Sequence, residues 1–410
     1  MLAKREPLKL NLIEILVIVA FAYSIAPIVS RFISDYLTTY FYMLIVVALI
    51  ALVMLIKGTR SLNDCIVLLV PFLLWKGLSF LTSRSGIVLW AYQAMLDLLP
   101  VVLGYYFLYH VKDERFGFFA KIIFWLCLIT CITTIIGCME FPDASRYLAT
   151  VDNPDAAKAV LYNWRNIGGY EFVYMIVLTH PLVIIAQKAG KIKKIHAFLC
   201  TALVFALSIF SGYTTALLLT LLTTFTYFLN KKLTPKQLIF WVVCVIVITV
   251  TFFTIFSDLL IWLADVIDNK FISDRLRSLA GGREGIEGSD DNRIALYETS
   301  LNTFLKSPIL GSYWGGGSNG GHSFLLDFMA QFGIVGLSVL IFAYCVIYKY
   351  FFAPYKNKKG FGFVIWTFVQ TLILSLVNTG MWLIVLTLII PIFLKVIYKG
   401  DEKSENTVDS

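Results

Sequence analysis

Residues 323–359 read SFLLDFMAQFGIVGLSVLIFAYCVIYKY and then FFAPYKNKK, a long apolar run that ends in a cluster of lysines. The apolar part is longer than the roughly 17–25 residues that an α-helix needs to cross the hydrocarbon core of a bilayer. Lysines that gather directly beyond such a run indicate the cytoplasmic side, where basic loops are retained. The stretch therefore predicts both a transmembrane helix and its direction across the membrane.

The same pattern repeats along the chain. Lysine clusters follow every second apolar run, as at residues 188–194, whereas the short breaks between them hold only Arg31 and Arg84. This alternation predicts an all-α polytopic membrane protein with about twelve transmembrane helices and both termini in the cytoplasm. The apolar runs lie near residues 12–29, 40–56, 65–81, 87–109, 117–138, 170–185, 196–210, 213–229, 238–256, 323–350, 361–377 and 381–398.

Residues 196–230 allow two interpretations. They could form one long helix with a break at Ser211-Gly212, or two short helices that cross the membrane in opposite directions. A single crossing would leave one of the two flanking lysine clusters outside the cell, against the bias of basic loops toward the cytoplasm. Two crossings are therefore predicted.

The composition is that of an integral membrane protein. Hydrophobic residues make up 59% of the 410 residues, and charged residues only 15%. The net charge of +8 resides in the cytoplasmic lysine clusters, so it does not indicate a surface for nucleic acid. We expect one membrane domain over residues 1–410, surrounded by membrane lipid and without a nucleic-acid partner.

Two connections on the predicted outer side, residues 139–169 and 257–322, are far too long for turns. The start of the second loop mixes apolar residues with charges, which is typical of short amphipathic helices on a membrane surface. Asp291 or Asn292 is predicted to cap a further helix that continues to about Leu305. The predicted apolar side of that helix comprises Ile294, Tyr297, Leu301 and Leu305.

A glycine-rich run leads from that helix to His322, the only histidine on the predicted outer side, and Ser323 is predicted to cap the next helix. Histidine titrates near neutral pH, so it can accept a proton from a hydroxyl group at physiological pH. The free N–H groups of a helix start also favour anions. A histidine that only caps or packs at the interface is the alternative interpretation.

The two long outer loops hold six arginines and three lysines. A planar guanidinium makes two-pronged contacts with phosphate or carboxylate, which a lysine ammonium cannot reproduce. The arginines as a set therefore favour recognition of an anion. For each single arginine, pairing with a nearby acid such as Asp274 or Glu284 remains open. Asp290 and Asp291 are interpreted as solvated or capping acids rather than as metal ligands.

Lys76 and Asp97 are the only charged residues deep within the apolar runs. They belong to consecutive helices and differ in predicted height by about 7 Å, which a lysine side chain can cover. Intramembrane charges usually pair with each other, so an ion pair is predicted. A role in proton transfer or in binding lipid phosphate is the alternative.

The second loop and the next helix contain four short motifs: Arg293-x3-Tyr297, Ser307-Pro-Ile-Leu-Gly311, Gly320-Gly-His322-Ser-Phe-Leu-Leu and Gly333-Ile-Val-Gly336. Together they resemble the signature of the O-antigen polymerase/ligase superfamily, which includes the Wzy-type capsular and O-antigen polymerases. The segment Asn166-Ile-Gly-Gly-Tyr170 is similar to capsule polymerases of the same group.

The resemblance implies a glycosyltransferase of the bacterial cell membrane that joins undecaprenyl-pyrophosphate-linked repeat units on the extracytoplasmic side. The donor and the acceptor are both lipid-linked oligosaccharides, a chain-length regulator protein is a further implied partner, and neither a metal nor another cofactor is expected. His322 would deprotonate the acceptor hydroxyl. Arginines would stabilise the departing pyrophosphate, since charge stabilisation at a leaving group is often the largest catalytic contribution.

The resemblance ranks Arg293 first among these arginines. It is followed by Arg165, Arg283, Arg277 and Arg275, whereas Arg146 and Lys306 are expected to matter much less. One departure affects this ranking: family members often carry Ser-Arg-Gly at the start of a middle span, and the comparable place here reads Ser211-Gly212-Tyr213. We expect the missing arginine to be absent altogether or replaced from elsewhere, for example by Arg165 or Arg283.

Two other functions remain possible at this stage. A ligase of the same superfamily, which transfers finished glycan to another acceptor, would use similar groups. A flippase for lipid-linked oligosaccharide or another secondary transporter would also have about twelve spans. It should show internal repeats and interrupted helices at matching positions in two halves, and the sequence shows no convincing repeat.

Overall fold

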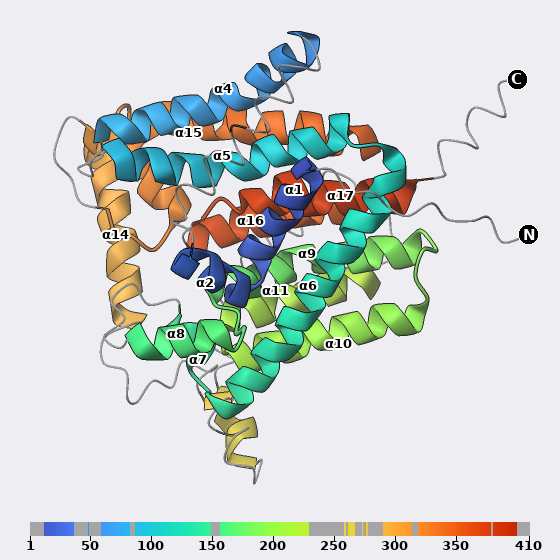
Figure 1. The fold of residues 1–410 in the computed structure, drawn as a ribbon. Helices are drawn as coiled ribbons and strands as arrows, with labels where there is room; N and C mark the ends of the chain where they lie inside the picture. The colour runs from blue at the N-terminus through green and yellow to red at the C-terminus, as the bar shows by residue number, and fades with distance from the viewer. Residues whose placement is uncertain are drawn as a thin grey trace, which may run out of the picture.

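The computed structural model describes residues 12–36, 48, 59–82, 87–148, 156–228, 258–259, 261–266, 273, 276–277, 290–313, 319–378 and 380–399. Regular structure in this part of the chain is entirely helical (Figure 1). The α-helices are α1 Leu12–Ile25, α2 Pro27–Tyr36, α4 Thr59–Thr82, α5 Ile87–His110, α6 Asp113–Glu140, α7 Ala144–Tyr147, α8 Ala156–Trp164, α9 Tyr170–Lys188, α10 Lys194–Ser211, α11 Thr214–Phe228, α14 Asp290–Lys306, α15 Phe324–Ile347, α16 Phe361–Val377 and α17 Ile390–Tyr398. Short 3-10 helices cover η1 Gly311–Tyr313 and η3 Ala353–Tyr355, and π-helical turns cover η2 Tyr348–Phe352 and η4 Ile384–Ile389.

Within these residues, four helices are long and apolar enough to cross a membrane, and the bent pair α1–α2 would make a fifth. Two of the predicted runs, residues 40–56 apart from Ala48 and residues 238–256, lie outside the described residues. The number of twelve crossings therefore stays a prediction. The four long segments are Arg115–Glu140, Tyr170–Lys188, Lys194–Ser211 and Phe324–Tyr355, and the shorter apolar helices are Ile66–Phe80, Thr214–Thr226, Phe361–Val377 and Ile384–Tyr398.

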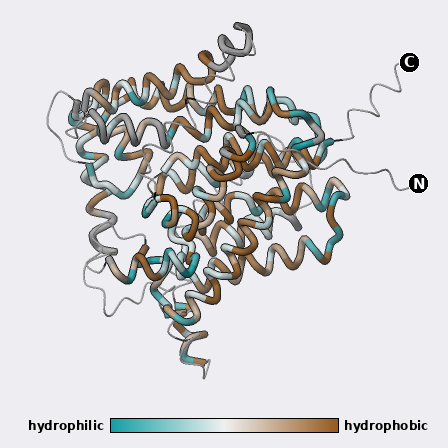
Figure 2. The backbone as a smooth tube through the Cα atoms, in the orientation of Figure 1, coloured by the Kyte–Doolittle hydropathy of each residue, from teal (hydrophilic) through white to brown (hydrophobic). Residues whose placement is uncertain are grey.

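The bundle is apolar inside and, on several helices, outside as well. Helix α9 lies at its centre and has twelve buried residues, whereas α6 and α10 lie at the periphery. Large apolar side chains point outward from the peripheral helices, for example Trp125 with 57% of its surface exposed and Phe198 with 67%. Figure 2 shows the apolar colouring running along these helices. Such exposed apolar surface is typical of a protein surrounded by lipid.

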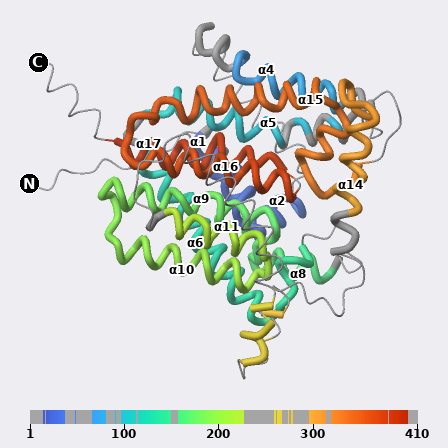
Figure 3. The backbone as a smooth tube through the Cα atoms, turned by 180° about the vertical axis from the view of Figure 1, so that it is seen from behind, coloured from blue at the N-terminus to red at the C-terminus, as the bar shows by residue number. Residues whose placement is uncertain are grey.

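The connections between helices gather at two ends of the bundle. One end carries the last turn of α17 and the described lysine clusters (Figure 1). Its segments are joined by hydrogen bonds from Lys395 Nζ to the Leu108 carbonyl (3.1 Å) and from the Tyr398 hydroxyl to the Lys359 carbonyl (2.5 Å). We call it the lysine-rich end. The opposite end carries α2, α7, α8 and α14, and α14 lies across the ends of other helices (Figure 3). Lysine clusters at one end are what the alternating pattern predicts.

The first apolar run departs from its prediction. Instead of one crossing over residues 12–29, α1 ends at Ile25 and α2 begins at Pro27, with a bend of 113° between the two helices. Proline lacks an N–H group and suits the first position of a new helix, so the chain turns there. The 14 residues of α1 span about 21 Å, which is shorter than a hydrocarbon core of about 30 Å.

Residues 196–230 fold as two helices, as predicted. Helix α10 ends at Ser211, Gly212 adopts a left-handed conformation with φ of +73°, and α11 begins at Thr214. A residue with a Cβ atom would be strained in this conformation, which explains the glycine at the turn. The two helices pack against each other, so the turn is a hairpin at the end opposite the lysines.

Candidate functional site

The stretches that carry the resemblance fold into one unit. Helix α15 is interrupted at Gly333, where φ is +61° and ψ is −155°. The segment that follows α14 fills this interruption: the Ile334 amide donates to the Pro308 carbonyl (2.8 Å) and the Val335 amide donates to the Ile309 carbonyl (3.2 Å). A Cβ atom on Gly333 would clash with the carbonyl of Ile309. The glycine is therefore required by both its backbone conformation and this close contact.

A single carboxylate fixes the loop that carries His322. Asp327, in the first turn of α15, accepts hydrogen bonds from the amides of Gly321 (3.2 Å) and Ser323 (3.1 Å) and from the Ser300 hydroxyl of α14. The Ser300 oxygen in turn accepts the amide of Gly320 (2.8 Å). The loop is thus tied to two helices. The sequence analysis did not identify Asp327 or Ser300. The only sequence feature that could have indicated this role is an acid, Asp327, one helical turn after the predicted cap Ser323.

Ser323 caps α15 as predicted, because its hydroxyl accepts the amide of Leu326 at 3.1 Å. Directly before it, the side chain of His322 is exposed. Among the described residues, none is hydrogen-bonded to the His322 ring. The backbone around this histidine is therefore fixed while its side chain is exposed.

Helix α14 confirms the predicted helix within a residue or two, although Asp291 and Asn292 lie inside it and do not cap it. Its predicted apolar side is only partly right, because Tyr297 is half-buried and bonded to the Val377 carbonyl but the two leucines face outward. Leu301 and Leu305 are exposed, whereas Ser300 and Thr303 are buried and face the protein. The reason is close packing against the glycine loop: a Cβ atom on Gly320 would clash with the backbone of α14. Small polar residues fit this contact, and the leucines are left on the outer surface of the helix.

Two of the ranked arginines form exposed ion pairs with acids. Arg165 pairs with Glu140, and its guanidinium lies 4.9 Å from the ring centroid of Phe141. Arg277 pairs with Asp265 at 2.8 Å. Pairing with a nearby acid, the alternative to anion binding in the sequence analysis, is therefore observed for these two arginines. No described contact joins either of them to His322.

The other ranked arginines are less fully described. Arg293 lies in the first turns of α14, on the same helix as Ser300, and its side chain is outside the described part of the chain. Arg275 and Arg283 lie outside the described residues altogether. Their proposed roles therefore remain predictions.

An arginine that was ranked low from the sequence contacts the turn at Ser211-Gly212-Tyr213. Arg146 of α7 donates to the carbonyl of Gly212, and its Nε atom would be 3.2 Å from a Cβ atom at that glycine. The adjoining Tyr213 hydroxyl donates to the Ser145 carbonyl at 2.9 Å. We had expected Arg165 or Arg283 here. No sequence signal links residues 146 and 212, because they come from separate helices.

Four aromatic rings pack together beside the Gly212 turn. Tyr213 contacts Tyr174 with a centroid distance of 5.5 Å, and Trp382 lies 5.8 Å from both Tyr174 and Tyr170. Trp382 has a φ of +56°, which is uncommon for a bulky residue. A strained backbone conformation of this kind is kept only where the surrounding structure imposes it, and such positions are often found at functional sites. The conformation of Trp382 therefore makes this aromatic cluster a candidate part of the site.

The turn before Trp382 connects the aromatic cluster to the His322 loop. The amide of Phe324 donates to the Asn378 carbonyl (3.0 Å), and the Tyr297 hydroxyl of α14 donates to the Val377 carbonyl (2.9 Å). Two buried donors in this turn, Asn378 Nδ2 and Trp382 Nε1, have no acceptor among the described residues. Burying a hydrogen-bond donor without an acceptor costs about 1–3 kcal/mol of folding free energy. A bound ligand that supplied an acceptor atom here would remove this cost and would therefore bind more tightly.

The first outer loop is anchored by Asn166, a buried residue with a φ of +57°. Its amide nitrogen donates to the hydroxyls of Thr130 and Thr133 (3.1 Å each), and its amide oxygen accepts from the Ile28 backbone (3.3 Å). Two residues later, the amide of Gly168 donates to Thr134 (2.7 Å). This segment therefore joins α6, the α1–α2 bend and the start of α9.

Lys76 and Asp97 form an ion pair in the structure. The ammonium of Lys76 is buried and lies 4.0 Å from the ring centroid of Trp75, which in turn packs edge-on against Phe324 at 5.9 Å. Phe324 is two residues beyond His322. The ion pair therefore supports the base of the loop that carries the histidine, while 42% of the Asp97 side chain is exposed.

Comparison of the sequence with protein-family models and with curated proteins finds no match. The resemblance to the polymerase superfamily therefore rests on the motif residues themselves.

Proposed function

We propose that this protein is a polysaccharide polymerase that joins undecaprenyl-pyrophosphate-linked repeat units on the outer face of the bacterial cell membrane. The observation that carries the proposal is the single unit formed by the motif stretches. Ser307–Gly311 fills the interruption at Gly333, and Asp327 and Ser300 hold the loop that exposes His322. This unit lies at the end of the bundle opposite the lysines, where an outer-face enzyme would meet its substrates.

In the proposed reaction, a ring nitrogen of His322 accepts the proton of an acceptor sugar hydroxyl. The acceptor oxygen attacks the anomeric carbon of the donor glycan and forms the new glycosidic bond. The bond between that carbon and the pyrophosphate oxygen breaks, and undecaprenyl pyrophosphate leaves with the electron pair. Proton transfer to a positioned side chain contributes roughly 10²–10⁴-fold to such a reaction.

Arginines would stabilise the negative charge on the departing pyrophosphate. Arg293 remains the first choice, because it shares α14 with Ser300 and Tyr297, which contact the His322 assembly. Arg146 becomes the second, because its guanidinium lies on the Gly212 turn beside the aromatic cluster. Arg165 and Arg277 move down, since no described contact joins either of them to the His322 assembly or to the Gly212 turn.

The direct test is reconstitution of the purified protein in liposomes with lipid-linked repeat units as the sole glycan. A polymerase should give a ladder of increasing polymer length and should release undecaprenyl pyrophosphate. Product that forms only after a lipid-core or protein acceptor is added would assign the protein as a ligase. Movement of a labelled lipid-linked unit between leaflets without any new glycosidic bond would assign it as a transporter and refute the proposal.

A further inference from the structure

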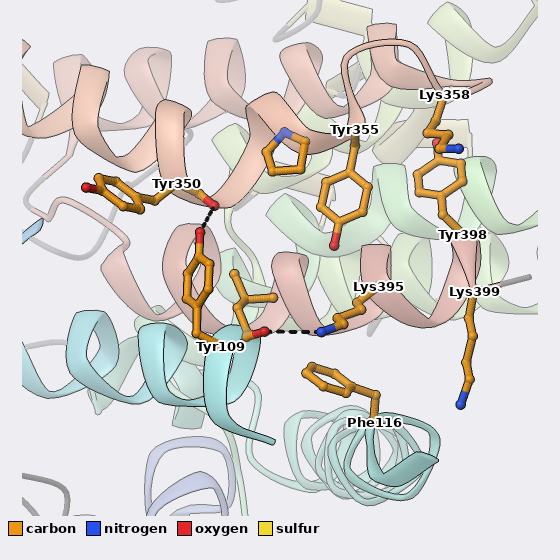
Figure 4. Close-up of a pocket in the computed structure, with 10 residues that line it drawn as sticks. Tyr109, Phe116, Tyr350, Tyr355, Lys358, Lys395, Tyr398 and Lys399 are labelled. Atoms are coloured by element: carbon orange, nitrogen blue, oxygen red, sulfur yellow. Dashed lines mark hydrogen bonds between the residues drawn. The ribbon is translucent and has the colours of Figure 1, made fainter. Parts of the chain in front are cut away.

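Polar groups on the walls of a cavity at the lysine-rich end bond to each other. The cavity has a volume of about 220 Å³ and lies between the ends of α5, α6 and α17 and the segment that follows α15 (Figure 4). Lys395 Nζ donates to the Leu108 carbonyl (3.1 Å), and the Tyr109 hydroxyl donates to the Tyr350 carbonyl (3.2 Å) (Figure 4). These groups are therefore satisfied without a ligand.

The turn at residues 377–382, which leads from α16 to η4, differs in this respect. It contains two buried N–H donors, Asn378 Nδ2 and Trp382 Nε1, that have no acceptor among the described residues. Three carbonyls of the same turn do accept hydrogen bonds, namely those of Val377, Asn378 and Gly380. Nearly all buried donors in proteins have an acceptor. Two without one in a single turn favour an acceptor that comes from a bound molecule.

The backbone of this turn is strained as well. Trp382 has a φ of +56°, and Gly380 has a φ of +135°. A bulky residue rarely adopts a positive φ, and the strain lowers the stability of the folded protein. Departures from local rules, such as this conformation and the unsatisfied donors, are expected mainly at functional sites. Their coincidence at Trp382 indicates a residue that serves binding rather than stability.

The rings around Trp382 have the composition of a small-molecule site. Trp382 lies 5.8 Å from the ring centroids of both Tyr170 and Tyr174, and Tyr213 packs against the same two tyrosines. Tyr170, Tyr213 and Asn378 are only half-buried, so part of each side chain is accessible. Sites for small molecules are typically aromatic, with a few polar groups that fix the orientation of the ligand. The turn supplies those polar groups.

We propose that this turn and its four aromatic rings bind a glycosyl ring of the lipid-linked repeat unit. The apolar C–H groups of the sugar would pack on the rings, and two of its oxygen atoms would accept from Asn378 Nδ2 and Trp382 Nε1. The Asn378 carbonyl accepts the amide of Phe324, two residues beyond His322, so the sugar would be held on the same assembly as the proposed base. The assignment to the repeat unit rests on the proposed polymerase reaction.

The chemistry of these groups favours a sugar over the pyrophosphate of the same substrate. Both donors are uncharged, whereas phosphate is bound most strongly by charged donors such as a guanidinium group. The face of an aromatic ring carries partial negative charge, which repels an anion but suits C–H groups. The pyrophosphate is therefore left to the arginines.

The test compares two buried tryptophans that differ in one hydrogen bond. Trp366 Nε1 donates to the Thr223 hydroxyl (3.1 Å), whereas Trp382 Nε1 has no acceptor among the described residues. Trp382→Phe and Trp366→Phe remove the same atoms. Thermal unfolding in detergent is measured with and without the repeat-unit oligosaccharide, which mild acid releases from its lipid carrier. A bound sugar raises the melting temperature by an amount set by its concentration and its Kd.

Without oligosaccharide, we expect Trp382→Phe to lower the melting temperature less than Trp366→Phe, because only the latter breaks a hydrogen bond. With oligosaccharide, the upward shift should persist in Trp366→Phe and shrink in Trp382→Phe, as affinity falls about 3–10-fold. Asn378→Asp keeps the size of the side chain but removes its donor, so it should weaken the affinity to a similar degree.

Three results would overturn the proposal. A loss of melting temperature in Trp382→Phe equal to or larger than that in Trp366→Phe, without sugar, would mean that the Trp382 N–H already has a partner. No shift in the original protein, or an unchanged shift in both Trp382→Phe and Asn378→Asp, would mean that the sugar does not bind here. A shift that inorganic pyrophosphate produces, lost in the same variants, would assign the donors to the leaving group instead.

The polymer ladder separates this proposal from the proposed function. A ladder made by the original protein without any shift on addition of oligosaccharide would refute the sugar site alone. The expected shifts in a protein that makes no ladder would refute the polymerase and leave the sugar site in place.

Discussion

His322 makes the sharpest prediction for a single residue. If it is the general base, His322→Ala should leave the protein folded and able to bind lipid-linked donor, yet slow glycosyl transfer by about 10²–10⁴-fold. His322→Gln should also be poor, since an amide can hydrogen-bond but cannot accept a proton near pH 7. Polymer length on a gel, read beside the level of membrane protein, measures both effects. A well-expressed glutamine variant that makes full-length polymer would instead leave His322 as an orienting residue.

Replacing an arginine by lysine tests whether its charge alone or the shape of its guanidinium group is needed. Arg293→Lys should impair polymerisation strongly at matched expression, because a point charge does not reproduce a two-pronged contact with pyrophosphate. The position of Arg146 against Gly212 leads us to expect a comparable loss in Arg146→Lys. Lys306→Arg, at the end of α14, is the control and should be close to normal. Normal chain length in the Arg293→Lys strain would exclude this residue as a pyrophosphate clamp.

Side-chain positions could be predicted only where local rules applied. The cap at Ser323 and the pairing of Lys76 with Asp97 follow from spacing along the chain, and the structure contains both interactions. The contact of Arg146 with Gly212 joins two helices that are not neighbours in sequence, and no periodicity announces it. Residue type indicated which arginines could bind an anion, but not which of them pair with acids.

Among the elements, α15 depends most on one backbone position. Gly333→Ala should destabilise the protein by about 2–4 kcal/mol, since the new Cβ atom would be strained at a φ of +61° and would clash with the Ile309 carbonyl. Gly362→Ala in α16 is the matched control, because nothing lies within 4 Å of its added Cβ atom. Thermal unfolding in detergent compares the two. Equal stability of both variants would refute the close packing of residues 307–311 into this helix.

The bounds of the helices could be predicted from the sequence better than the side of each helix that is buried. The run of α15 follows from hydropathy and from its cap Ser323. Helix α14 lies close to its predicted bounds, although its predicted caps Asp291 and Asn292 are inside the helix. The buried side of α14 could not be predicted, because it faces a glycine loop and not a leucine-rich surface. The bend between α1 and α2 was missed because the apolar run continues past Pro27, and hydropathy alone does not register the change of direction.

At the scale of the whole molecule, the distribution of lysines anticipated the arrangement of the bundle. In the part of the chain that the structure describes, the lysine clusters lie at one end, and the hydrogen bonds of Lys395 and Tyr398 join the segments there. The other end could not be predicted from hydropathy, since its structure depends on polar contacts such as those of Asn166 and Asp327. The candidate site lies where these contacts concentrate.

The orientation of this bundle in the membrane is the final prediction. Cysteines introduced at the exposed positions Asn319 and Lys158 should react with an impermeant thiol reagent in intact cells or spheroplasts, because both lie at the predicted outer end. A cysteine at the exposed Asn357 of the lysine-rich end should react only after the membrane is permeabilised. The chain without an added cysteine supplies the background, since its native cysteines include the exposed Cys345. Labelling of Asn357→Cys alone in intact cells would invert the topology, place His322 in the cytoplasm and remove the basis for glycosyl transfer on the outer face.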